Sequence, residues 1–363
     1  MLPLLMTGSE WFDSRPGGLN RYFFELFRAF EQLDEVDVHA WAFGSAPSID
    51  GARSWGTEPG TVARVRRSRR RVDDAIPAVI DRHFALYGPP RSKYRQALHI
   101  VHFQGPWADE SRVAGGGGLA VRAKREIERA RYKEADHLIV LSAPFAEILV
   151  DDYSIPRDRI SIIPPGVDAS RFAGLQTTSS SDAARPVVLC VRRLEQRMGI
   201  DVLIRGWDRV LETHPTAELR IVGTGTAEAS LRDLAAGTRV PQSIVFTGRV
   251  GDAELIDEYT RSQITVVPSL ALEGFGLIAL ESLAAGRAPI VTDCGGLPDA
   301  VRGLDPSLIV TPGNEQQLAS RIVEALSGTR PSTDACRAHA ATFSWESVAQ
   351  RHLDLYRGLG ARA

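Results

Sequence analysis

Short apolar runs alternate with longer segments in which apolar residues recur at helical spacing. In the first half of the chain, the runs predict strands at residues 2–7, 36–41, 98–103, 137–141 and 160–163. Between them, the apolar spacing predicts helices over residues 19–33 and 142–150. This alternation of strand and helix is typical of an open sheet of parallel strands.

A second series of the same kind fills the other half. Strands are predicted at 187–191, 219–222, 244–246, 264–267, 289–292 and 308–310, and helices over 200–211, 227–236, 253–261, 276–285 and 315–326. Residues 176–185, rich in Ser, Thr, Asp and Ala, have no periodicity and predict a linker between the two series. Each half therefore predicts its own doubly wound α/β domain, and residues 345–359 predict one more amphipathic helix.

Length and composition agree with this picture. At roughly 100–200 residues per domain, the 363 residues predict two domains. The 43 basic and 45 acidic residues nearly balance, which argues against a uniformly basic nucleic-acid binder. The three cysteines, Cys190, Cys294 and Cys336, are too scattered for a disulfide framework or a zinc site. With neither a signal peptide nor a long apolar run in view, the expectation is a cytoplasmic protein.

Arginine dominates the basic residues, since only Lys93, Lys124 and Lys133 are lysines. The codon bias of a GC-rich genome accounts for most of this excess. Residues 64–71, however, hold six arginines in eight positions. This cluster predicts a solvated face, a contact with an anionic membrane, or a grip on a phosphorylated acceptor. No aromatic residues interleave it, so it gives no indication of nucleic-acid binding.

The most informative segment is Pro-Ser-Leu-Ala-Leu-Glu-Gly-Phe-Gly-Leu-Ile-Ala-Leu-Glu at 268–281, which follows a predicted strand and opens a predicted helix. Gly274 and Gly276 would let backbone N–H groups approach a ligand, and the helix start favours an anion. Glu281 lies about one and a half turns inside the helix, too deep for an N-cap. It is suited to bind a pair of sugar hydroxyls, and the alternative is that it faces solvent.

Glu273 and Glu281, with seven residues between them, resemble the paired-glutamate motif of retaining glycosyltransferases with the GT-B fold, glycosyltransferase family four. Further segments agree in order: Gly17-Gly18, Pro-Pro-Gly-Val-Asp at 164–168, Arg-Arg-Leu at 192–194, Gly-Thr-Gly at 223–225, and Gly-Gly-Leu-Pro at 295–298. The resemblance implies two Rossmann-like domains facing a cleft. An acceptor-side domain would cover 1–170, with the helix at 345–363 packed back on it. A nucleotide-sugar domain would cover 173–344.

The resemblance also implies roles for individual residues. Arg193 would contact the donor diphosphate, and Arg197 would act with it. The family's second cation is a lysine directly before the glycine, where this chain has Met198, so the role of Arg197 is an inference from a departure. Glu273 and the backbone of residues 274–277 would hold the transferred sugar and phosphate, and Glu281 the ribose. The donor-binding set is completed by Gly17, Gly18, Gly223, Arg249, Val250, Gly274, Phe275, Gly276 and Leu277.

The position of the family's first-domain histidine is open. His102 follows the apolar run that begins at residue 98, and it is the preferred match. In the alternative alignment Gln104 takes that place. His83, expected at the end of another strand, is a third candidate. The residue would orient the transferred sugar by hydrogen bonds, which an amide could also do. Asp168 lies in the segment that joins the domains and is interpreted as structural.

The predicted function is transfer of a sugar from a nucleotide-diphosphate donor of the UDP or GDP type to a sugar, lipid-linked or small-molecule acceptor, with retention. No cofactor or metal is expected, because no Asp-x-Asp motif occurs. Peripheral membrane contact remains open, and nucleic acid is not expected as a partner. The alternatives are a GT-B epimerase or phosphorylase, a non-catalytic sugar-nucleotide binder, and an NAD-dependent oxidoreductase. The last would need G-x-G-x-x-G after the first strand, where the chain has Thr-Gly-Ser-Glu.

Overall fold

The computed structural model describes residues 1–70, 76–106, 108, 117–173 and 185–362. The chain divides into two compact units, Met1–Gly166 with Trp345–Ala363, and Val167–Ser344. The sequence had placed the corresponding boundaries at 170 and 344. Apart from Arg185, the predicted linker at 176–185 lies outside the described residues.

The first unit is built on a seven-stranded sheet in the order β3-β2-β1-β4-β5-β6-β7, with every neighbouring pair parallel. The strands are β1 (Leu2–Glu10), β2 (Val36–Phe43), β3 (Ala52–Ser54), β4 (Val79–Arg82), β5 (Leu98–Phe103), β6 (His137–Val140) and β7 (Ile160–Ile162). Successive strands add on one side of β1 up to β3, and then on the other side from β4 onward. Ligands of doubly wound folds bind at the carboxyl edge where the order reverses.

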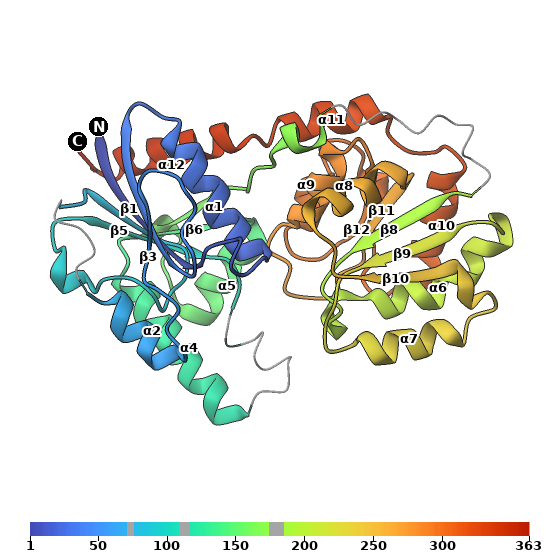
Figure 1. Ribbon diagram of the computed structural model, residues 1–363, viewed down its shortest axis with the longest axis horizontal. Helices are drawn as coiled ribbons and strands as arrows, with labels where there is room; N and C mark the ends of the chain where they lie inside the picture. Colours follow the sequence, from blue (N-terminus) through green and yellow to red (C-terminus); the bar gives the residue numbers. More distant parts are fainter. Residues whose placement is uncertain (71–75, 107, 109–116, 174–184, 363) are drawn as a thin grey trace. The chain divides into compact units, whose positions relative to one another are not determined.

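The helices of this unit are α1 (Gly18–Glu31), α2 (Thr61–Ser68), α4 (Gly118–Glu134), α5 (Ala143–Tyr153) and the C-terminal α12 (Trp345–Gly358). α12 packs against α1 although the two lie at opposite ends of the sequence (Figure 1). The contact is aromatic, since Tyr22 of α1 lies edge-on to Trp345 and Phe30 of α1 stacks on Tyr356. Buried aromatic pairs of this kind fix one helix on another.

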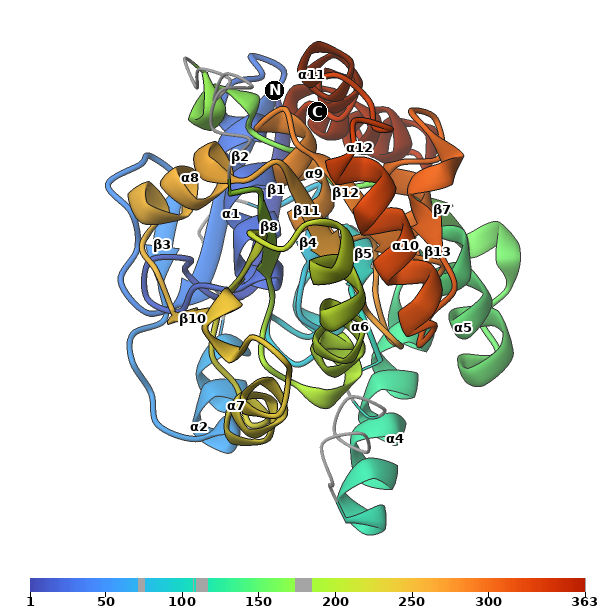
Figure 2. The same ribbon diagram turned by 90° about the vertical axis from the view of Figure 1, so that its right-hand side faces the viewer.

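The second unit has a six-stranded parallel sheet in the order β10-β9-β8-β11-β12-β13. Its strands are β8 (Val187–Val191), β9 (Glu218–Val222), β10 (Ile244–Gly248), β11 (Ile264–Val267), β12 (Ala288–Thr292) and β13 (Ile309–Val310). Its helices are α6 (Ile200–Thr213), α7 (Glu228–Ala236), α8 (Asp252–Arg261), α9 (Leu277–Ala284), α10 (Glu315–Leu326) and α11 (Thr333–Ala341). α6 and α10 pack side by side (Figure 2), and the strand order reverses between β8 and β11.

The predicted strands and helices are all present, with ends that differ by a few residues, so the fold class is confirmed. Four of the helices and strands described here were not predicted: β3, α2, α4 and α11. β4 was expected only as a strand ending at His83, without bounds, because Asp81 and Arg82 interrupt its apolar run. β3 is short, and α2 and α4 are rich in charged residues. No helix in the described part of the chain is both long and apolar enough to cross a bilayer.

Candidate functional site

The two segments that carry most of the predicted donor-site residues start side by side in the second unit. β8 and β11 are neighbours, with Ile264 paired to Val188 and Thr265 to Leu189. Residues 192–199 continue from β8, and residues 268–276 continue from β11. They therefore leave the carboxyl edge of the sheet at the point where the strand order reverses, the usual position of a ligand site in this architecture.

Glu273 is held in this region by an ion pair with Arg192. Arg192 is adjacent to Arg193, one of the two arginines that the sequence had assigned to the donor diphosphate. The Arg192 Nη2 donates to Glu273 Oε2, and the Ser269 hydroxyl donates to the same oxygen at 3.1 Å. Burial raises the pKa of the Glu273 carboxyl, but the charge of Arg192 and the two hydrogen bonds outweigh burial. The net pKa lies below the ordinary value, so the carboxylate is ionised at neutral pH.

The loop that carries Glu273 has an unusual backbone. Leu272 has a φ of 57°, in the left-handed region that side chains rarely adopt. Arg197 braces this turn, because its Nη1 donates to the carbonyl oxygens of Leu272 at 3.2 Å and Ala271 at 3.5 Å. Strained backbone of this kind is commonly found at functional sites. These two hydrogen bonds of Arg197 thus hold the loop.

α9 begins directly after the loop, at a glycine that the local geometry requires. Gly276 has a φ of 87°, and a Cβ on it would collide with the side chain of Leu297. Phe275 is buried and packs against Phe343 at a ring distance of 5.8 Å, so its side chain belongs to the core. Gly274 and Leu277 are half-buried on either side. The left-handed Gly276 thus fixes the point at which α9 starts.

Glu281 is buried, with 4% of its surface exposed, so the alternative of a solvent-facing residue is wrong. Arg171 lies within 3.4 Å of Glu281 Oε1, and the Tyr259 hydroxyl donates to Oε2 at 3.4 Å. Arg171 also lies 3.2 Å from Asp252. Burial and these contacts hold the Glu281 carboxylate in a fixed place within the second unit.

The remaining predicted donor residues lie at the strand ends of the same unit. Gly223, after β9, has a φ of 137°, and a Cβ there would overlap the carbonyl oxygen of Arg192. Arg249 is exposed and Val250 half-buried, just beyond β10. Arg193 is exposed as well. Sequence reasoning missed Arg192 and Arg171, because nothing in the pattern distinguishes them from neighbouring arginines.

In the first unit, Gly17 and Gly18 form the exposed start of α1. Gly17 is the N-cap in an extended conformation, and a Cβ built on it would meet nothing within 4 Å. Neither packing nor backbone geometry within the described residues demands a glycine there. The loop leaves open space next to a helix start, which is where an anion can approach.

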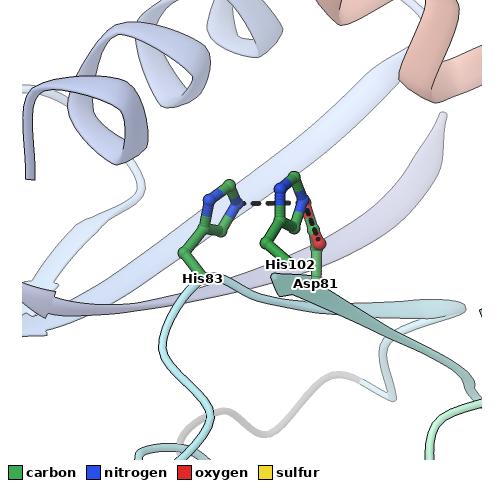
Figure 3. A group of neighbouring side chains, drawn as sticks. All are labelled: Asp81, His83 and His102. Carbon is green, nitrogen blue, oxygen red and sulfur yellow. Dashed lines mark hydrogen bonds and ion pairs between the residues drawn. The ribbon is translucent and has the colours of Figure 1, made fainter. Parts of the chain in front are cut away.

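His102 lies inside β5 and its side chain has no exposed surface. Its ring stacks on His83 at 3.9 Å and parallel to His352 at 5.3 Å, and its Nε2 is 2.9 Å from Asp81 Oδ1. His83, directly after β4, contacts the other oxygen of Asp81 at 3.1 Å (Figure 3). Two imidazoles thus flank one buried carboxylate. A ligand could reach His102 only if this cluster opened.

Gln104, the match in the alternative alignment, has different surroundings from His102. It follows the end of β5 and is half-buried. Its amide Nε2 is buried and has no hydrogen-bond partner in the described part of the chain. An amide in this position, at the carboxyl edge of the sheet, has a free donor for a ligand.

Asp81, His83 and His102 also offer three metal-ligand atoms that lie within 4.8 Å of one another. The two rings are nearly parallel, with planes only 20° apart. Ligands to one ion direct their lone pairs at a common point, which stacked rings do not do. Asp81 is instead surrounded by hydrogen-bond donors, including the Tyr356 hydroxyl at 2.8 Å. The absence of a metal requirement stays a prediction.

The arginines of the cluster at 64–71 have different surroundings in the structure. Arg64 is held by Glu10 at 3.0 Å and lies over the ring of Phe43, so it serves the fold. Arg66, Arg67, Arg69 and Arg70 are exposed, and Arg71 lies outside the described residues.

Asp168 accepts a hydrogen bond from the Ser170 amide at 3.0 Å and caps a short 3₁₀ turn, a structural contact.

Comparison with known proteins agrees with this arrangement. Residues 176–342 match the family model described as glycosyl transferases group 1, and residues 16–171 match that of glycosyltransferase family 4. A D-inositol 3-phosphate glycosyltransferase from Acidothermus cellulolyticus is 34% identical over 89% of this chain and 72% of its own length.

Two solved structures resemble the whole chain. A sucrose-phosphate synthase from Thermosynechococcus elongatus has a TM-score of 0.77 at 21% identity, with full coverage of both chains. The Anabaena protein HepE, solved with UDP-glucose, has a TM-score of 0.72 at 15% identity and covers 99% of this chain and 100% of its own. Neither an epimerase, a phosphorylase nor an oxidoreductase is supported by these matches. The chain belongs to glycosyltransferase family four: it is a glycosyltransferase of the GT-B fold that moves a sugar from a nucleotide-diphosphate donor to an acceptor hydroxyl.

Proposed function

We propose that this glycosyltransferase uses a UDP- or GDP-linked sugar and retains the anomeric configuration without a metal ion. The observation that carries the proposal is the turn at 273–277, where an ionised carboxylate precedes the glycine-led start of α9. The helix start suits a phosphate, and the carboxylate suits a sugar hydroxyl. Because HepE is solved with UDP-glucose, a uridine nucleotide is the first donor to test.

In the proposed reaction, the bond between the anomeric carbon and the donor phosphate oxygen breaks. A bond from the acceptor oxygen to the same carbon forms on the same face. The acceptor hydroxyl proton passes to the departing phosphate oxygen. Negative charge therefore grows on the diphosphate, and nearby cations together with the start of α9 stabilise it. These groups do the work that a metal ion does in other transferases.

Two further residues are given roles in this proposal, one in each unit. Glu281 accepts hydrogen bonds from the ribose hydroxyls of the donor, supported by its burial inside α9, where a carboxylate needs donors. Gln104 orients the transferred sugar in place of His102, supported by its unpartnered amide and by the complete burial of His102.

The test is an assay of nucleotide release from a panel of UDP- and GDP-sugars, with and without sugar, lipid-linked and small-molecule acceptors. We expect acceptor-dependent release for one donor, a product with the donor's anomeric configuration by NMR, and full activity in EDTA. An inverted product would overturn retention, and loss of activity in EDTA would overturn metal independence. Release that never depends on any acceptor in the panel would count against transfer as proposed.

For the acceptor side, we propose a peripheral contact with an anionic membrane through α2. Arg66 and Arg67 of α2 are exposed, as are Arg69 and Arg70 directly after it, together with Val62, which is 68% exposed. Exposed arginines near an anionic surface contribute attraction that salt screens. We expect binding to phosphatidylglycerol vesicles but not to phosphatidylcholine vesicles, and loss of binding in R66E/R67E. The control R209E/R302E makes the same charge change at exposed positions of the second unit. Equal loss in both variants would contradict the proposal.

A further inference from the structure

Arg192 carries a buried guanidinium with an unused hydrogen-bond donor. Only 7% of its side-chain surface is exposed. Among the described residues, its hydrogen bonds are all made by Nη2, to Ser269, Glu273 and the sulfur of Met198. Its Nε–H is buried and has no acceptor in the described part of the chain. Since buried donors are almost always paired, this N–H marks a place for an acceptor that arrives from outside the chain.

The charge around this place suits an anion. Arg192 and Arg197 both lie close enough to Glu273 to lower the pKa of its carboxyl. Two guanidinium groups against one carboxylate leave an excess positive charge at the end of β8. Position 223 accommodates only a residue without a Cβ. Gly223 therefore lets the backbone that follows β9 come close to Arg192, at the end of the neighbouring β8. A guanidinium in such a setting pairs well with phosphate oxygens, because both groups are multidentate.

We propose that Arg192 binds the diphosphate of the donor, in the role that the sequence had assigned to Arg193 and Arg197. This inference rests on the proposed function. Arg193 is exposed, and Arg197 donates hydrogen bonds to the backbone carbonyls of Ala271 and Leu272 in the loop. Glu273 holds the Arg192 guanidinium in a fixed orientation before the donor arrives, so little ordering is needed on binding.

The same contacts explain the methionine that departs from the family motif. Met198 Sδ lies 2.9 Å from Arg192 Nη2, so the two side chains reach the same point from different positions in the chain. A lysine at 198 would place its ammonium against the guanidinium, and two buried cations repel each other. The cation of this site is therefore supplied from position 192, and position 198 is left apolar.

The experiment compares R192A, M198K, the double variant R192A/M198K and R192K with the wild-type chain. Binding of inorganic diphosphate, UDP and GDP is measured by calorimetry, and folding is checked by thermal denaturation. R209A, at an exposed position of α6, is the matched control. We expect R192A to bind diphosphate about tenfold to a hundredfold more weakly, as for loss of one charged hydrogen-bonding group. M198K alone should also weaken binding.

The double variant R192A/M198K decides the question. A misfolded protein would not regain diphosphate binding when a second substitution is added. We expect R192A/M198K to bind diphosphate about tenfold more tightly than R192A, and R192K to keep part of the affinity. Wild-type affinity in a folded R192A, or a double variant no better than R192A, would overturn the inference. If diphosphate binds through Arg192 but no UDP- or GDP-sugar is used, the proposed donor is wrong and the anion site stands.

Discussion

Tyr356 of α12 donates a hydrogen bond to Asp81 of β4 at 2.8 Å, across 275 positions of sequence. Burial raises the pKa of the Asp81 carboxyl, but the neighbouring His102 and His83 lower it by more than burial raises it. The net pKa therefore lies well below the usual range. A buried, ionised carboxylate therefore fixes the C-terminal helix to the sheet of the first unit. His83 and His352 are buried and neutral at pH 7, because burial lowers the pKa of His83 to about 4 and that of His352 to about 3.

Removing the Tyr356 hydroxyl should destabilise the first unit. We expect Y356F to lower the free energy of unfolding by about 1.5–3 kcal/mol, the usual contribution of a hydrogen bond to a charged group. Urea denaturation measures this. Tyr94 provides the control, since its buried hydroxyl has no partner among the described residues, and Y94F should be neutral or slightly stabilising. A Y356F protein as stable as Y94F would contradict the proposed anchor.

The free energy of unfolding should decrease as the pH is lowered below about 6.5, the ordinary pKa of histidine. The pKa of both His83 and His352 is lowered by burial first and by the nearby His102 second. In the unfolded chain these imidazoles take up protons below about pH 6.5, while in the folded chain they stay neutral down to about 4 and 3. Their contribution to stability is therefore complete above 6.5 and is lost as the pH falls.

The measurement is urea unfolding of the wild type and H352Q between about pH 7 and 4.5. Each imidazole contributes a slope of up to about 1.4 kcal/mol per pH unit in this range. Glutamine cannot titrate and can still donate to the Val348 carbonyl, which His352 contacts at 2.7 Å. We expect a shallower slope in H352Q, and an identical slope would show that His352 is not kept neutral in the folded chain.

Glu281 should determine how strongly the ribose is recognised. If its carboxylate accepts from the ribose hydroxyls, the wild type should bind UDP or GDP about tenfold more tightly than the 2′-deoxy nucleotide. E281A should bind both nucleotides equally and weakly. Calorimetry with the four combinations gives the coupling between residue and hydroxyl. A preference for ribose that survives in E281A would place the ribose elsewhere.

Gly276 should tolerate no side chain. In G276A the methyl group would collide with Leu297 in addition to imposing a left-handed conformation on alanine. We expect a loss of about 2–4 kcal/mol in unfolding free energy, the sum of the backbone strain and the overlap. Gly248 has a similar φ of 72° with open space around its Cβ, so G248A isolates the backbone part, about 1–2 kcal/mol. Equal losses in the two variants would mean that Leu297 moves aside freely.

Local periodicity was enough to find most strands and helices of both sheets, because a parallel strand buried on both faces is a run of apolar residues. The paired glutamates were equally visible, since a glycine-led helix start and an acid deep inside the helix are both local features. Short or highly charged elements were not predicted by periodicity. The bounds of β4 were not predicted because Asp81 and Arg82 interrupt its apolar run, and the Tyr356 hydroxyl that bonds the buried Asp81 lies 275 positions away in the sequence.

By itself the sequence determined the two α/β units, the turn at 273–277 and the family. Only the tertiary structure decided which of two adjacent arginines is buried against Glu273, and that His102 is enclosed while Gln104 is not. The physical reason is the same in each case. A side chain's direction at a strand end, and the charges it meets there, depend on partners brought together from β4, β5 and α12, or from β8 and β11, and no local pattern contains those partners.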